Sequence, residues 1–175
     1  MRRYLVVANQ TLGGEELDTA IRDHMATGPC HFHLLVPATA AADLDRQYLA
    51  EVRDADPTID AEDRRAARHL LEDELEVTGQ AASGEDLGRR LARERLRQQL
   101  AKLRGLGAEA SGEVGVADPV EAIRVVLHRW EFDAVILSTL PGRRSRWLAM
   151  DLPTRIRRTF KLPVTHVTGA SVPTP

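Results

Sequence analysis

The sequence predicts an α/β fold in which a parallel sheet carries helices on both faces. Short apolar segments alternate along the chain with longer segments whose apolar residues recur at helical spacing. Continuous apolar runs are typical of strands buried on both faces, which is the usual situation in parallel sheets. Parallel strands need crossover connections, and intervening helices supply them. The 175 residues are enough for one such domain.

Composition narrows the class of protein. The net charge is −2, whereas a dedicated nucleic-acid-binding domain usually has a clear basic excess. The single cysteine, Cys30, excludes an intramolecular disulfide framework and a cysteine-rich zinc site. No apolar run approaches the roughly 18–20 residues of a membrane span, and the one after Met1 is too short for a signal peptide. We therefore expect a cytoplasmic protein that binds neither a membrane nor a specific nucleic acid.

The first part of the chain predicts two strands around one helix. Residues 4–8 form an apolar run, and residues 15–26 have one apolar face at helical spacing. Glycines at 13 and 14 precede this helix, and Gly28 and Pro29 end it. Residues 31–36 predict the second strand.

Residues 38–84 predict an acidic insertion. The segment from residue 37 to 80 contains 12 acidic and 5 basic residues. A helix is expected at 59–77, and a longer one at 85–104 with a leucine stripe on one face and arginines on the other. We interpret residues 1–175 as a single domain with this insertion and a frayed tail at 169–175.

The remaining elements continue the alternation. Residues 109–116 predict a third strand, whose mostly alternating pattern favours a place near the edge of the sheet. Asp118 and Pro119 are a typical N-cap and first residue of the next helix, expected to reach Trp130. Residues 132–137 predict a fourth strand followed by a loop at 138–142. A helix is expected to begin between 151 and 153, and a last strand covers 162–167.

Four segments in this order resemble the universal stress protein family. They are the opening strand and turn at 4–11, the Asp-Pro helix start at 116–123, the fourth strand at 132–139 and the closing strand at 163–167. The resemblance covers residues 3–168. It implies a Rossmann-like five-stranded sheet of order 3-2-1-4-5, and homodimers that often form through the last strand, here near Val164 to Val167.

The family divides into members that bind ATP and members that do not. The resemblance implies that ATP binders have a Gly-x2-Gly-x9-Gly-[Ser/Thr] motif after the fourth strand, in which glycines let backbone N–H groups approach phosphate. The motif positions fall here on Ser138, Pro141, Asp151 and Leu152, and none matches. Pro141 has no N–H to donate, and Asp151 places a carboxylate where the binders place phosphate. Asn9 stands where the binders have an aspartate near adenine. We therefore expect no cofactor.

A second hypothesis keeps nucleotide binding, of ATP or AMP, at a divergent site. Between residues 143 and 161 there are seven basic residues and one acidic residue. The first two arginines follow the loop at which open α/β sheets bind ligands, and guanidinium groups can replace backbone donors for an anion. The competing interpretation is that these arginines are solvated or paired with the acidic insertion. The candidate binding residues are Asn9, Val36, Ser138, Thr139, Gly142, Arg143, Arg144 and Ser145.

No catalytic motif is present. The sequence lacks the Gly-x-Ser-x-Gly elbow, the Gly-x4-Gly-Lys-[Ser/Thr] loop, His-Glu-x-x-His and a Gly-x-Gly-x-x-Gly turn after the first strand. We predict that the protein is not an enzyme, with slow hydrolysis of a bound nucleotide as a third hypothesis. His31 and His33 share one face of a strand but lack a third metal ligand, and we interpret them as packing residues.

Taken with the resemblance, these observations predict a binding and signalling module of the universal stress protein type. It would act as a dimer and without the family's usual ATP binding. A protein partner is a further expectation, and the acidic insertion would either contact that partner or cover the ligand cleft.

Overall fold

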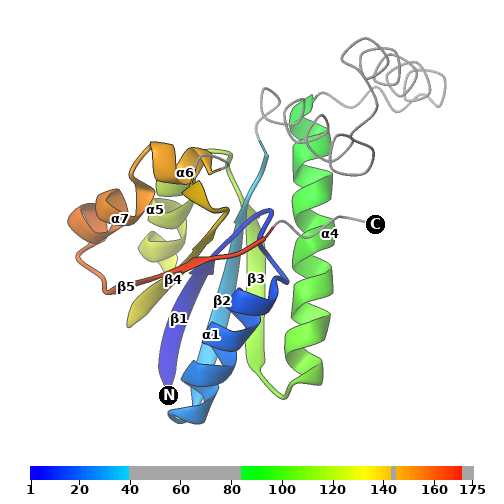
Figure 1. Ribbon diagram of the computed structural model, residues 1–175, viewed down its shortest axis with the longest axis vertical. Helices are drawn as coiled ribbons and strands as arrows, with labels where there is room; N and C mark the ends of the chain where they lie inside the picture. Colours follow the sequence, from blue (N-terminus) through cyan, green and yellow to red (C-terminus); the bar gives the residue numbers. More distant parts are fainter. Residues whose placement is uncertain (40–83, 143–144, 171–175) are drawn as a thin grey trace, which may run out of the picture. The chain divides into compact units, whose positions relative to one another are not determined.

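The computed structural model describes residues 1–39, 84–142 and 145–170 (Figure 1). The chain divides into two compact units, Met1–Ala38 with Leu91–Pro175, and Thr39–Arg90. The described part of the second unit is Thr39 together with the beginning of helix α4 (Gly84–Gly105). The helix predicted at 59–77 lies outside the described residues.

The first unit is built on an open sheet of five parallel strands in the order β3-β2-β1-β4-β5. The predicted fold class and strand order are confirmed. Val6 at the centre pairs with Leu34 on one side and Ile136 on the other. The strands are β1 (Arg2–Val7), β2 (Cys30–Pro37), β3 (Glu109–Gly115), β4 (Ala134–Thr139) and β5 (Val164–Thr168).

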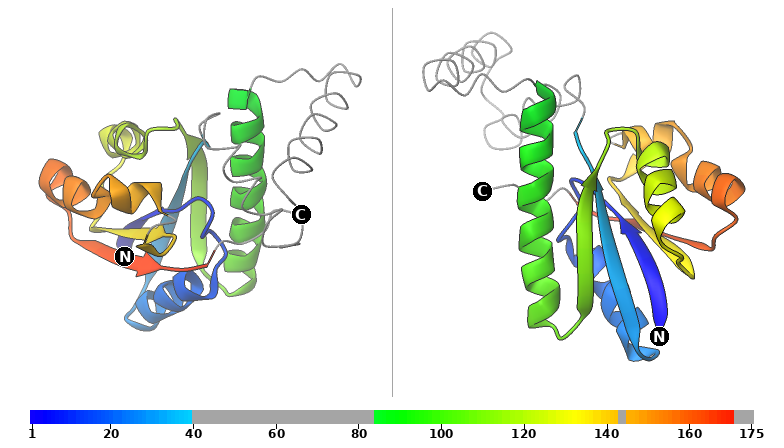
Figure 2. Two further views of the ribbon diagram at one scale, coloured as in Figure 1. Left: turned by 45° about the horizontal axis from the view of Figure 1, so that its top comes forward. Right: turned by 180° about the vertical axis from the view of Figure 1, so that it is seen from behind.

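Helices cover both faces of this sheet (Figure 2). Helix α1 (Glu15–Ala26) and residues 91–105 of α4 pack on one face. Helices α5 (Pro119–Arg129), α6 (Arg146–Ala149) and α7 (Leu152–Phe160) lie on the other. This placement follows from crossovers that leave β1 toward one face and β4 toward the other.

The two faces hold separate aliphatic cores because successive strand residues point to opposite sides. Leu5, Val7 and Leu35 face α5 and α7, whereas Val6 and Leu34 face α1 and α4, and all five are fully buried. Burial of each such side chain stabilises the fold by about 1.5–3 kcal/mol before entropy is counted. Strands buried on both faces explain why the sequence shows continuous apolar runs.

Some boundaries differ from the prediction. β4 extends through Ser138 and Thr139, which the sequence places in a loop, because their hydroxyl groups find partners inside the fold. The short helix α6 was not predicted. The start of α5 is confirmed: the Asp118 carboxylate accepts the Glu121 N–H at 2.9 Å, and Pro119 opens the helix.

None of the helices in the described ranges combines the length and the apolar character that crossing a bilayer requires.

Candidate functional site

The carboxyl ends of β1 and β4 form the switch point of the sheet. The chain leaves β1 for α1 on one face and leaves β4 for α6 and α7 on the other (Figure 1). Open α/β sheets bind ligands in the crevice at such a point. Six of the eight candidate residues can be located around it, while Arg143 and Arg144 lie outside the described residues.

Asn9 uses its amide to hold neighbouring elements together. Its Nδ2 donates to the Pro37 carbonyl at 3.0 Å, and its Oδ1 accepts from the Arg95 guanidinium at 2.7 Å. Arg95 is only 5 % exposed, although the sequence places it on the outer face of its helix. The Asn9 amide therefore ties the end of β1 to the end of β2 and to α4.

Ser138 and Thr139 are also bonded within the protein, on opposite faces of β4. Ser138 is 1 % exposed, and its hydroxyl donates to Thr11 Oγ1 at 2.8 Å. The Thr139 hydroxyl lies 2.8 Å from Nε2 of His166 on β5. Burial lowers the pKa of His166, and the charge of Arg157 lowers it further, so this imidazole is neutral at pH 7. Both hydroxyls thus have partners that a ligand would need to displace.

The loop after β4 leads into α6. Gly142 is exposed with φ of +46°, and a Cβ there would meet no atom within 4 Å. Ser145 is buried and caps α6, since its Oγ accepts the Leu148 N–H at 3.2 Å. Val36, by contrast, is fully buried in the core between the sheet and α1 and α4.

Asp151 precedes α7 in a left-handed conformation, with φ of 49° and ψ of 42°. This is the position of the third glycine in the ATP-binding motif of the resembled family. The backbone there keeps a conformation that favours glycine, but the residue carries a carboxylate. Pro153 also removes one N–H from the first turn of the helix. The amino end of α7 therefore offers an anion fewer donors than a glycine-opened helix does.

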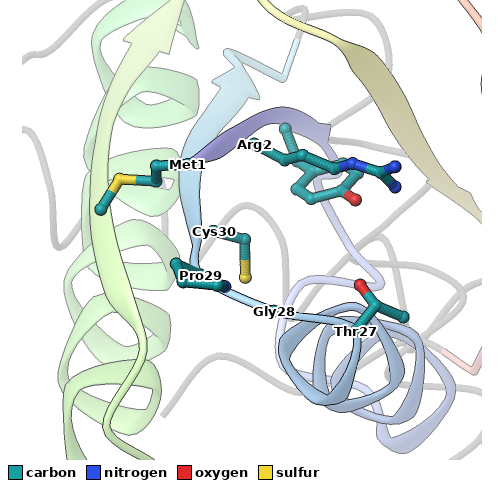
Figure 3. Close-up of a pocket in the computed structure, with 7 residues that line it drawn as sticks. Met1, Arg2, Thr27, Gly28, Pro29 and Cys30 are labelled. Carbon is teal, nitrogen blue, oxygen red and sulfur yellow. The ribbon is translucent and has the colours of Figure 1, made fainter.

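Two cavities lie at the opposite end of the sheet, near the amino ends of the strands. Their volumes are about 290 and 350 Å³, and both are lined by Met1, Gly28, Pro29 and Cys30. In Figure 3, the side chains of Arg2 and Thr27 lie across the first cavity from the side chain of Met1. Burial raises the pKa of the Cys30 thiol, and the negative charge of Glu109 adds to the shift. The thiol is therefore protonated and weakly nucleophilic at neutral pH.

A buried carboxylate links α1 to α4. Asp18 is 1 % exposed; it accepts from Gln99 Nε2 at 2.8 Å and is paired with the Lys102 ammonium. Lys102 also donates to the Gly13 carbonyl at 3.2 Å. This cluster packs two helices together and is not part of the switch point.

Three partners of the candidate residues were not predicted from the sequence: Thr11, Arg95 and His166. Position in the chain was the available signal for two of them: Thr11 follows the first strand closely, and His166 lies in the last strand. In the described ranges, no three His, Cys, Asp or Glu side chains are grouped so that they would hold a metal ion.

No model of a known protein family matches this chain, and no curated protein matches it. Fold and site geometry are therefore the basis for the functional proposal.

Proposed function

We propose that this chain is a binding and signalling module of the universal stress protein type that works without the family's usual ATP binding. The observation that carries the proposal is that polar side chains at the switch point already have hydrogen-bond partners inside the protein. Asn9, Ser138 and Thr139 each use their polar atoms for hydrogen bonds inside the protein. A nucleotide would have to break these bonds, and each bond contributes about 1 kcal/mol to stability.

The phosphate side of the site supports the same proposal. Pro141 has no N–H, and Asp151 sets a negative charge before the helix that would receive the phosphates. Like charges repel, so the carboxylate opposes the anion that the helix terminus would otherwise attract. Slow nucleotide hydrolysis is correspondingly not expected.

The second candidate function is nucleotide binding through arginines. The observation that favours it is Gly142, which is exposed, has a left-handed φ and directly precedes Arg143 and Arg144 in the sequence. A flexible exposed glycine lets the backbone approach a phosphate, and two guanidinium groups supply charge-assisted hydrogen bonds.

Titration calorimetry with ATP and Mg²⁺, together with mass spectrometry of co-purified nucleotide, separates the two functions. We expect no binding heat and no bound nucleotide. Micromolar affinity, equivalent to about −8 kcal/mol, would establish the second function instead. In that case Arg143→Ala with Arg144→Ala should abolish binding. Arg104→Ala with Arg158→Ala is the matched control, because it removes two exposed arginines near the carboxyl ends of α4 and α7 and so removes the same charge.

We propose further that the module dimerises through β5. This strand lies at one end of the strand order. The Gly169 N–H donates to the Thr139 carbonyl at 3.0 Å, so by alternation the Thr168 N–H points away from β4. Light scattering should give twice the 19.4 kDa monomer mass. Thr168→Pro should shift the protein to monomer without lowering its helix content, whereas a monomeric parent protein would refute the proposal.

A further inference from the structure

Two histidines of β2 and two polar residues of β3 form a connected cluster on the face of the sheet that also carries α5. Strand register sets it up, because His33 pairs with Ser111 and Leu35 pairs with Glu113. The Ser111 hydroxyl lies 2.9 Å from His33 Nδ1 and 3.2 Å from His31 Nε2. His33 Nε2 lies 3.3 Å from Glu113 Oε1, and Arg129 at the end of α5 donates to the same carboxylate oxygen.

The charges in the cluster fix the direction of each hydrogen bond. Burial alone would raise the pKa of Glu113, but hydrogen bonds from Arg129 and His33, together with their charges, hold it below the ordinary value. An ionised carboxylate can only accept hydrogen bonds. His33 Nε2 therefore carries the ring proton and donates a hydrogen bond to Glu113. His33 Nδ1 is then a lone pair, and the Ser111 hydroxyl donates to it.

His31 completes this assignment. The Ser111 oxygen has lone pairs left, and His31 Nε2–H donates to one of them at 3.2 Å. The other ring nitrogen, Nδ1, is buried and has no hydrogen-bond partner within the described part of the chain. A bare lone pair there costs less than a buried, unbonded N–H would, which agrees with the proton being on Nε2.

The geometry points to Ser111 as an activated nucleophile, with His33 as its general base and Glu113 as the group that orients His33, acting on small activated esters. Nucleophile, base and orienting carboxylate are the side-chain triad of serine acyl transfer, and such a triad is recognised by geometry rather than by sequence position. His31 acts as a positioning residue, because its N–H directs the serine proton toward His33. Arg129 keeps Glu113 ionised.

The side chains of the cluster are partly exposed to solvent. Ser111 is half-buried, and the His33 and Glu113 side chains are 12 % and 30 % exposed. The His33 ring packs 5.8 Å from Phe132, and Arg3 lies 5.5 Å from both Phe132 and the half-exposed Trp130. Phe132 is buried and holds the His33 ring by packing, whereas Trp130 is the exposed ring of this group.

The reaction balances in two half-steps. Ser111 Oγ attacks the ester carbonyl while its proton moves to His33 Nδ1; the bond to the leaving alcohol then breaks, and the alcohol takes that proton. The product is an acyl-serine. Water then attacks the acyl carbon while one of its protons moves to His33 Nδ1; the bond between the acyl carbon and Oγ breaks, Ser111 recovers that proton, and the acid leaves. The net change is ester plus water to acid plus alcohol.

Labelling of the full chain with an aryl fluorophosphonate tests the nucleophile directly, because serine oxygen displaces fluoride at phosphorus. We expect one adduct, mapped to Ser111, and hydrolysis of p-nitrophenyl acetate above background. Ser111→Ala should abolish both, and His33→Gln should slow labelling by about a hundredfold. Thr27→Ala and His128→Gln are matched controls: the first is an exposed hydroxyl bonded to a helix carbonyl, the second an exposed histidine of α5.

The assignment is overturned if the parent protein takes up no label, or if His33→Gln and Glu113→Gln label as fast as the parent. A second variant avoids dependence on ester turnover. In Ser111→Cys, the introduced thiol should react with iodoacetamide at least tenfold faster than Cys30, whose pKa is raised in the same molecule. Equal rates at the two thiols would show that the environment of Ser111 is not activating.

Discussion

Removing the Lys102 ammonium should expose how much the buried Asp18 carboxylate depends on its partners. We consider Lys102→Met, which keeps most of the aliphatic length of the side chain but removes its charge. The Asp18 carboxylate is 1 % exposed and, among the described residues, would keep the Gln99 hydrogen bond at 2.8 Å. The lysine side chain is 45 % exposed, so part of its interaction with Asp18 is screened by solvent.

The magnitude follows from these exposures. Breaking a fully buried ion pair from one side costs about 3–5 kcal/mol, because a charge is left without compensation. Solvent at Lys102 and the retained Gln99 bond reduce this to about 2 kcal/mol. For a chain of this size, that corresponds to a fall in Tm of about 4–8 °C. Urea denaturation followed by circular dichroism at pH 7 measures the free energy of unfolding.

A double-mutant cycle identifies the cause of the loss. Asp18→Asn keeps an oxygen that accepts from Gln99, but it is neutral, so removing Lys102 leaves no buried charge without a partner. The double variant with Lys102→Met should therefore be about 1 kcal/mol more stable than the two single losses of stability, added together, would give. Strict additivity, or a Lys102→Met protein within about 0.5 kcal/mol of the parent, would refute the reasoning.

Three further changes have defined outcomes. Gly112→Ala should destabilise the fold by about 1–3 kcal/mol in urea, because its Cβ would lie 2.6 Å from the Leu34 carbonyl oxygen. Lys161→Gly should raise the free energy of unfolding by about 0.5–1 kcal/mol, since Lys161 ends α7 with φ of 56°. Burial lowers the pKa of His31, His33 and His166 below 6.5, so the unfolded chain takes up protons first. Stability should therefore fall between pH 7.5 and 5.5, and a flat urea midpoint over that range would contradict this.

The fold could be predicted because the strands at the centre of its sheet are buried on both faces. Runs such as Leu5 to Val7 and Val135 to Leu137 are apolar without interruption and fully buried. A parallel sheet that is covered by helices on both sides buries such runs completely. The strand order, in contrast, came from the family resemblance, since apolar runs say which segments are strands and not which strands are neighbours.

Polar residues that point into the protein were the main source of error in predicting which side chains are buried. Arg95 and Gln99 lie on the sheet side of α4 with Ala92 and Leu96, at helical spacing, yet the charge of Arg95 assigned it to the outer face. Arg95 can be buried because its guanidinium donates a hydrogen bond to Asn9 Oδ1. A helix pattern shows the period of the apolar residues, but it does not show which polar residue meets a partner from another element.

The same limit applies to the Ser111 cluster. The alternation of a strand predicts correctly that His31 and His33 share a face. Their partners come from β3, about 80 positions later in the chain. Which residue of β3 stands opposite His33 depends on the register between two parallel strands joined by a long connection. A shift of one residue would have placed Ser111 and Glu113 on the opposite face.

The switch point and the Ser111 cluster therefore differ in what a ligand would meet. At the carboxyl ends, Asn9, Ser138 and Thr139 are held by neutral partners or by Arg95, and a ligand gains from them only after breaking those bonds. On the face that carries α5, the hydrogen bonds around Ser111 all run in one direction, from His31 through the serine to His33, and from His33 to an ionised Glu113. A carbonyl carbon that approaches Ser111 breaks none of these bonds, because the proton transfer to His33 follows the bond already present. We thus expect reactivity of this chain toward electrophiles at Ser111 even if no nucleotide binds at the switch point, and the two assays can succeed or fail independently.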